Sequence, residues 1–297
     1  MRSFRPEAAV LAALLCAAAP GARAQAPALD SLVLRLGAMS AVTGLEDAMA
    51  DTLLGLLPGS HRDRAGNVVL VRGSGEPVRV AACGMDEVGY VVGEISPEGY
   101  LTLRRVGTTP VGPLFDQFLE GQRVTVFGRR GAVPGVVGVR STHLTRGRPQ
   151  ADEAPFPLDN AYVDVGAASA LEIAALGIQL LSPVTRAKAP RHYGTGDGLV
   201  AGPWLAQRAA CAALLSAASR ATPGAGTTVV AFTARRHMGN DGVAFLRTSW
   251  PSAELADLGE TAWQLPVKYP RTPVETVTMS DVVALEQRLV AWLGGAR

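Results

Sequence analysis

The feature that most constrains the fold of this chain is a change of pattern in its middle. Helical and strand-like segments alternate towards both ends, with predicted helices over 45–57 and 205–221 and predicted apolar strands over 68–72 and 227–234. Between residues 101 and 190 the strands are short, glycine and proline are frequent, and helical spacing is scarce. This change predicts that a small β-domain is inserted between two halves of one α/β domain.

The predicted fold class is therefore α/β, with a mixed sheet flanked by helices and an inserted small β-barrel-like domain. The first half of the α/β domain is predicted at 25–100 and the second half, which is shortened, at 191–297. The inserted domain is predicted at 101–190. With 297 residues, 48% of them hydrophobic, the chain has enough apolar side chains for packed cores in one or two domains.

The first 24 residues have the pattern of a signal peptide. Two arginines among the first five residues precede an apolar run over 8–19, which is too short to span a bilayer comfortably. Ala22 and Ala24 then supply the small residues of a cleavage site, with cleavage expected after Ala24. We expect residues 1–24 to be removed and the protein to be periplasmic or secreted; the alternative is a membrane anchor that stays attached.

The apparent basicity of the chain lies largely in that leader. The full chain has 28 basic and 26 acidic residues, and the segment 1–24 contains three of the arginines and one glutamate. The mature chain is therefore neutral, which does not favour nucleic acid or an acidic membrane surface as a partner. We expect no membrane association after cleavage.

Two cysteines, Cys83 and Cys211, remain in the predicted mature chain. An exported protein with two cysteines could form one disulfide, but the sequence does not give the distance between them. Two buried free thiols are the preferred interpretation, and the disulfide is the alternative.

Eight segments, taken in order, resemble one family. They are SAVTGLEDAM, DRAGNVVLVRGSG, AACGMDEVGYVVGEISPEGYLTL, GQRVTVFGRRGAVPGVVG, YVDVGAASALEIAALGI, LAQRAACAALLSA, VVAFTARRHMG and YPRTPVETVTMSDVVAL. Together they cover most of the mature chain and resemble the tetrahedral-type aminopeptidases, also called deblocking or glutamyl aminopeptidases. The resemblance implies a metallopeptidase-like α/β domain with a β-barrel-like insertion and a site for two metal ions.

The same resemblance implies that this site is degenerate. The family places its first histidine ligand at the position of Gly84, in a motif whose aspartate, here Asp86, braces that ligand. The bridging aspartate of the family falls on Ala206. Glycine and alanine have no donor atom in their side chains, so both ligands would be lost.

The remaining positions carry the wrong charge or are missing. The family's pair of glutamates, which supplies the general base and a ligand, corresponds to Arg236 and His237, and a C-terminal histidine corresponds to Arg271. A further aspartate ligand belongs to a segment between Trp250 and Thr261 that this chain is expected to lack. A guanidinium about 5 Å from a divalent ion costs several kcal/mol even at an effective dielectric near 20.

These substitutions predict a pseudoenzyme with no catalytic residues, no metal ligands and no cofactor. Its role would be in binding, assembly or regulation, with peptides as the ligand class if it has one, and self-association through the inserted β-domain. Three alternatives remain open. The chain could be an active aminopeptidase that uses zinc or cobalt to release N-terminal residues from peptides; it could be an eroded gene product; or one zinc could be held in a rebuilt site by Cys83, Asp86 and His237.

Overall fold

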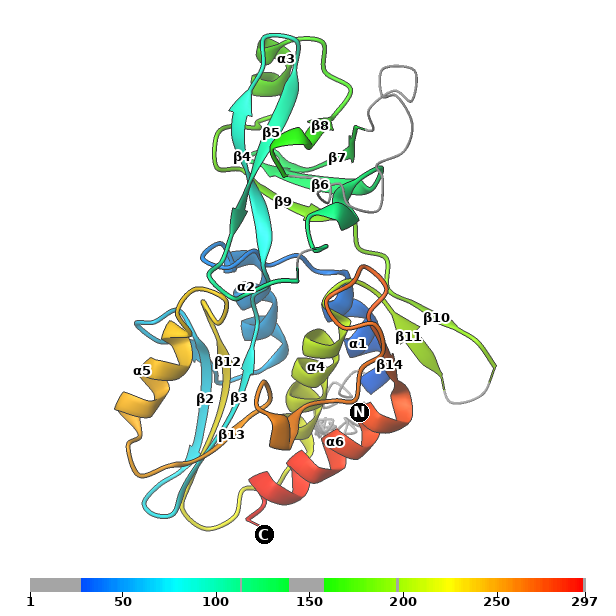
Figure 1. Ribbon diagram of the computed structural model, residues 1–297. Helices are drawn as coiled ribbons and strands as arrows, with labels where there is room; N and C mark the ends of the chain where they lie inside the picture. The colour runs from blue at the N-terminus through cyan, green and yellow to red at the C-terminus, as the bar shows by residue number, and fades with distance from the viewer. Residues whose placement is uncertain (1–27, 113, 139–157, 196–197, 296–297) are drawn as a thin grey trace, which may run out of the picture.

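The computed structural model describes residues 28–112, 114–138, 158–195 and 198–295. The predicted signal peptide, 1–24, lies outside the described residues. Figure 1 shows two parts, an α/β domain and a β-barrel above it, joined at the ends of two strands. No helix in the described part of the chain is long and apolar enough to cross a membrane.

The α/β domain is built on a five-stranded sheet of order β1-β2-β12-β3-β13. Its strands are β1 (His61–Arg62), β2 (Val68–Gly73), β12 (Thr227–Thr233), β3 (Val78–Gly84) and β13 (Glu254–Asp257). The central strands β12 and β3 are parallel and consist mainly of Val, Ala and Thr, as expected for strands that are buried on both faces.

Helices cover both faces of this sheet. One face carries α1 (Leu29–Ala38), α2 (Asp47–Leu56), α4 (Leu205–Arg220) and α6 (Met279–Leu293), whereas α5 (Asp241–Ser249) packs on the other. Most residues of α4 are buried, because this helix lies between α1, α6 and the sheet (Figure 1). That position explains why alanine and leucine make up most of this helix.

The inserted domain is a closed six-stranded barrel with an apolar interior. In barrel order its strands are β4 (Gly89–Ile95), β5 (Tyr100–Val106), β8 (Tyr162–Asp164), β7 (Gly131–Val137), β6 (Arg123–Gly128) and β9 (Pro183–Arg186). The predicted class, a mixed α/β fold with an inserted barrel, is confirmed. The barrel starts at Gly89, however, so the predicted boundary at residue 101 falls inside β5 and leaves β4 on the wrong side.

The remaining elements are short. The structure has 3₁₀ turns η1 (Gln117–Leu119), η2 (Leu158–Asn160) and η3 (Thr261–Trp263), and the helix α3 (Ala170–Ala175) at the far end of the barrel (Figure 1). A three-stranded sheet of order β10 (Arg191–Tyr193), β11 (Leu199–Ala201) and β14 (Thr276–Thr278) lies beside α6. Thr278 caps α6 by accepting the backbone N–H of Asp281.

A disulfide between Cys83 and Cys211 connects β3 to α4. The preferred interpretation of two free thiols is therefore wrong. The packing of α4 on β3 brings the two Cα atoms to 5.5 Å, within the range that a disulfide requires, although 128 residues separate the cysteines in the sequence.

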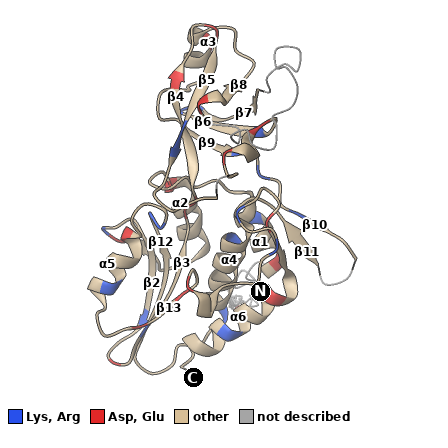
Figure 2. Ribbon diagram, viewed as in Figure 1, with Lys and Arg blue, Asp and Glu red and all other residues tan. Residues whose placement is uncertain are grey.

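Acidic and basic residues are interspersed along both domains of the described chain (Figure 2). Several form exposed ion pairs, such as Arg62 with Asp47 and Arg247 with Glu260. This mixture of signs agrees with the near-neutral charge of the predicted mature chain.

Candidate functional site

The carboxyl ends of three parallel strands meet at one edge of the five-stranded sheet. Because β3 pairs in parallel with both β12 and β13, Gly84, the segment that follows β12, and Asp257 all lie at this edge. Open α/β sheets bind their ligands at such an edge. The predicted site positions that the structure brings together here are Gly84, Asp86, Arg236 and His237.

Asp86 holds the segment after β12 in place. Its carboxylate is fully buried, and Oδ1 accepts the backbone N–H of Arg236 at 3.0 Å while Oδ2 accepts the backbone N–H of His237 at 2.9 Å. Both oxygens are thus engaged by backbone donors, so the retained acid supports the loop.

The ring of His237 is also hydrogen-bonded at both nitrogens. Nε2 lies 3.1 Å from the side-chain oxygen of Gln207, and Nδ1 lies 3.0 Å from the hydroxyl of Thr109. Gln207 donates from its amide nitrogen to the carbonyl oxygens of Gly84 and Asp86, so its oxygen accepts a hydrogen bond from Nε2–H of His237. The ring is then the neutral tautomer whose Nδ1 accepts a hydrogen bond from the hydroxyl of Thr109. Burial lowers the pKa of His237, against the opposing effect of Asp86.

Arg236 fills the space between two glycines at the sheet edge. A Cβ atom on Gly84 would lie 2.5 Å from Cδ of Arg236, and a Cβ atom on Gly259 would lie 1.8 Å from Nη2. The guanidinium donates from Nη1 to Oδ1 of Asp257 at 2.8 Å. A histidine at position 84 is therefore incompatible with this placement of Arg236, and glycine at both positions makes room for it.

The other two predicted positions do not join this cluster. Ala206 lies in the first turn of α4, where its N–H donates to the buried carboxylate of Glu275 at 3.1 Å. Arg271 donates its own N–H to Glu275 at 2.7 Å and points its guanidinium to the carbonyl oxygen of Pro110 at 3.3 Å. Glu275 thus connects the loop before β14 to the start of α4 through these two hydrogen bonds. Its burial raises the pKa of its carboxyl group.

Sequence reasoning missed Asp257. The segment between Trp250 and Thr261 was expected to lack a site aspartate, but it contains β13, and Asp257 ends that strand with its side chain 2% exposed. The sequence did contain a feature that could have indicated this residue: the short segment ELAD ends in an aspartate and is followed by a turn that contains a glycine.

The side chains at this edge do not fit a pair of zinc-type ions. Such a pair needs carboxylate and imidazole ligands, with one carboxylate bridging the two metals. In the described part of the chain, no group of three or more His, Cys, Asp or Glu residues is placed to hold a metal ion. The alternative single-zinc site of Cys83, Asp86 and His237 is not formed either, because Cys83 is in the disulfide and has no thiolate to offer.

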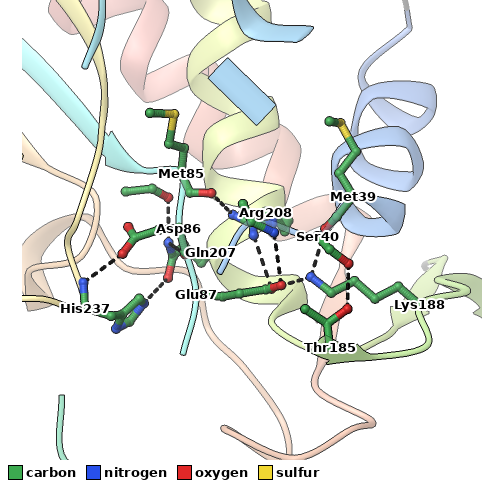
Figure 3. A network of polar contacts seen from close by, with 12 residues as sticks. Met39, Ser40, Met85, Asp86, Glu87, Thr185, Lys188, Gln207, Arg208 and His237 are labelled. Carbon is green, nitrogen blue, oxygen red and sulfur yellow. Dashed lines mark hydrogen bonds and ion pairs between the residues drawn. The ribbon is translucent and has the colours of Figure 1, made fainter. Parts of the chain in front are cut away.

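A second buried polar cluster adjoins the first and joins the two domains (Figure 3). Glu87 follows β3, Arg208 lies in α4, and Lys188 lies in the segment that leaves the barrel after β9. Oε2 of Glu87 accepts from Lys188 and, at 3.2 Å, from Arg208, while Lys188 also donates to the carbonyl oxygen of Met39 at 2.8 Å.

All three side chains of this cluster are 1–3% exposed. Burial works against ionisation of Glu87, but Lys188 and Arg208 outweigh it and hold its pKa below the ordinary value. Burial lowers the pKa of Lys188 to about 8, with Glu87 acting in the opposite direction. The cluster therefore fixes the barrel to the sheet edge with charges that few water molecules reach.

Comparison with known proteins identifies the family. The sequence model of the family described as M42 glutamyl aminopeptidase matches residues 66–256. The Escherichia coli K12 protein SgcX is 34% identical over 186 residues, which are 60% of this chain and 48% of that protein. The lysyl aminopeptidase of Pyrococcus furiosus is 31% identical over 176 residues, 59% of this chain and 48% of that protein. The chain spans about half the length of these curated relatives.

Solved structures agree on the fold. An aminopeptidase from the archaeon Desulfurococcus kamchatkensis superposes with a TM-score of 0.73 at 18% identity, covering 90% of this chain and 95% of that one. The TET1 peptidase of Pyrococcus horikoshii has a TM-score of 0.73 at 19% identity, covering 90% of this chain and all of that one. The sequence match and the shared architecture together show that this chain belongs to the M42 glutamyl aminopeptidase family.

Proposed function

We propose that this chain is a catalytically inactive member of the M42 family, with a role in binding, assembly or regulation. The observation that carries the proposal is Arg236, whose guanidinium fills the glycine-lined space at the sheet edge and pairs with Asp257. A permanent internal cation thus stands where the family resemblance places metal chemistry. Three other positions, Gly84, Ala206 and Arg271, have no side chain suited to a metal ligand.

We also propose that the protein has no resident metal cofactor. A divalent ion about 5 Å from the Arg236 guanidinium would meet a repulsion of several kcal/mol even at an effective dielectric near 20. The groups at this edge that could coordinate it, Asp86, His237 and Asp257, would first have to give up hydrogen bonds to the loop, to Gln207 and to Arg236. The repulsion by Arg236 and the loss of these hydrogen bonds both weaken the binding of zinc and of cobalt.

Metal analysis and an activity assay test this proposal together. We expect purified mature protein to hold less than about 0.1 equivalent of zinc or cobalt after brief exposure and desalting, because no three suitable ligands converge among the residues that the structure describes. We expect no release of N-terminal residues from a panel of short peptides with either metal added, under conditions in which the Pyrococcus furiosus lysyl aminopeptidase is active. Two equivalents of tightly held metal together with turnover would establish the alternative, an active aminopeptidase.

Self-association through the barrel is a further part of the proposal. The TET1 peptidase of Pyrococcus horikoshii can assemble into a tetrahedron or a large octahedral shell. This chain keeps the barrel, and the exposed leucines there include Leu171 on α3 and Leu180 and Leu181 before β9. Analytical ultracentrifugation should give a homo-oligomer whose mass falls in the Leu171→Asp/Leu180→Asp variant but not in Val283→Asp, which alters an exposed residue of α6. A wild-type monomer at micromolar concentration would end this part of the proposal.

Export to the periplasm or the medium completes the proposal. The disulfide between Cys83 and Cys211 supports it, because such bonds persist in oxidising compartments. Intact mass measurement of the protein recovered from the periplasmic fraction should give a chain that starts at Gln25. Recovery of an uncleaved chain in the cytoplasm or membrane would contradict export.

A further inference from the structure

A small cavity lies where the barrel meets the α/β domain, next to the sheet-edge cluster: its wall residue Trp204 has its ring centre 5.1 Å from that of His237. Its empty volume is about 240 Å³, which includes the solvent at its mouth. The polar side chains that line it are Glu87, Tyr90, Thr185, Arg186 and Lys188, and the apolar wall includes Val88, Pro203 and Trp204.

Arg186 is the unusual member of this lining. It ends β9 and is 7% exposed, with its guanidinium 4.7 Å from the ring centre of Phe115. It donates from Nη2 to the carbonyl oxygen of Phe115 at 2.6 Å and from Nε to that of Phe118 at 3.3 Å. Among the described residues no carboxylate lies within ion-pair distance of Arg186, and no described group accepts from Nη1. Nη1 is not among the enclosed polar atoms without a partner, and Arg186 lines the cavity, so this nitrogen is available to a ligand there.

The neighbouring charges do not balance Arg186. Lys188 and Arg208 already share the carboxylate of Glu87, whose other oxygen accepts the N–H of Ala41 at 3.2 Å. Three buried cations therefore have one carboxylate within ion-pair distance in the described part of the chain.

Two other carboxylates attract these cations electrostatically from beyond ion-pair distance, and both already accept hydrogen bonds from other groups. Asp116 accepts from Arg105 at 2.7 Å and from the hydroxyl of Tyr90 at 3.0 Å. Glu275 accepts the N–H groups of the loop and of α4 described above. Neither carboxylate is free to turn towards the cavity without losing these bonds.

We propose that this cavity is a binding site for a small monovalent anion, of the size of chloride or of a formate carboxylate. Nη1 of Arg186 and the third N–H of Lys188 would donate to it, and Trp204 with Val88 would shield it from water. The anion would lower the excess of positive charge at the domain junction and hold the barrel against the sheet. The cavity is too small for a peptide, and its positive lining excludes a metal cation.

Thermal unfolding in different sodium salts tests the proposal. At constant ionic strength, with gluconate as an anion too large to enter, chloride and formate should each raise the melting temperature saturably, by about 3 °C at ten times the dissociation constant. Acetate and propionate form the second arm. Stabilisation that fades from formate to propionate supports the proposed small-anion site, whereas stabilisation of equal size by propionate would contradict the proposed size of the ligand.

Matched variants locate the effect. Arg186→Gln should abolish the dependence on the anion, whereas Arg104→Gln should preserve it, because Arg104 is a surface arginine of the same barrel with a side chain 57% exposed. Equal dependence on the anion in wild type, Arg186→Gln and Arg104→Gln would overturn the proposal, since the salt effect would then be general.

Anomalous diffraction from wild-type crystals grown in bromide gives a readout that needs no variant. We expect a bromide peak in the cavity within about 3.5 Å of Nη1 of Arg186, and this peak decides the matter if Arg186→Gln does not fold. Density for an ordered water only, with no anomalous signal and no anion-dependent melting, would refute the site.

Discussion

Replacing Arg236 with alanine is expected to lower the free energy of unfolding by about 3 kcal/mol, because a buried carboxylate loses its cation. Asp257, 2% exposed, would keep only the N–H of Gly259 as a donor at 2.9 Å, while the space between Gly84 and Gly259 would be left empty. Urea unfolding followed by tryptophan fluorescence measures the change. Adding Asp257→Asn to the variant should recover about 1–2 kcal/mol, since a neutral amide costs less to bury than a charge.

The surface pair of Arg247 and Glu260 is the matched control. It is also an arginine–carboxylate contact, but its side chains are 58% and 59% exposed. Arg247→Ala should therefore change stability by less than about 0.5 kcal/mol. If Arg236→Ala proved no more destabilising than Arg247→Ala, the buried pair would not be in place, and the proposal of an inactive site would lose its main support.

Removal of the disulfide is expected to have an effect of similar or larger size. The bond closes a loop across 128 residues, and the chain-entropy model assigns loops of that order about 5 kcal/mol of stabilisation. The Cys83→Ala/Cys211→Ala variant should unfold at clearly lower urea concentration than the oxidised wild type. Because both cysteines are buried, the native wild type should resist reductant until it is partly unfolded.

Thiol titration supplies the control for this prediction. Mature wild type denatured without reductant should contain no titratable thiol, and after reduction it should contain two. The double variant should give the same unfolding curve with and without reductant. Two free thiols in protein purified under oxidising conditions, or identical unfolding of wild type and variant, would show that the bond is not formed.

The broad architecture could be predicted because it depends on local patterns. Apolar periodicity along the chain identifies helices and strands, and the change of pattern between residues 101 and 190 revealed the inserted domain. The predicted start of the inserted domain was misplaced because β4 is an apolar strand that follows β3 closely in the sequence. The pattern of apolar residues does not distinguish a strand of the α/β sheet from a strand of the barrel. The pairing of β4 with β5 and β9, which decides the matter, is a long-range contact.

The resemblance to the family assigned ligand positions to Gly84, Ala206 and Arg271, and the sequence shows that none of these residues is a usual zinc ligand. The arrangement of side chains at the sheet edge could not be predicted in this way. That Arg236 fills the space between two glycines and pairs with Asp257 depends on three strands ending at the same edge.

Local patterns in the sequence thus determined the fold class, and the resemblance of ordered segments indicated the family and the positions at which its ligands would stand. Only the packing of segments far apart in sequence decided three features of the structure. They are the disulfide, the ion pair of Arg236 with Asp257, and the burial of Arg186 without an ion pair in the described part of the chain. The physical reason is how far apart in sequence the interacting residues lie. Helical and strand periods are set by neighbours along the chain. A disulfide, an ion pair or a cavity instead forms only where residues far apart in sequence come within a few ångströms of one another in space.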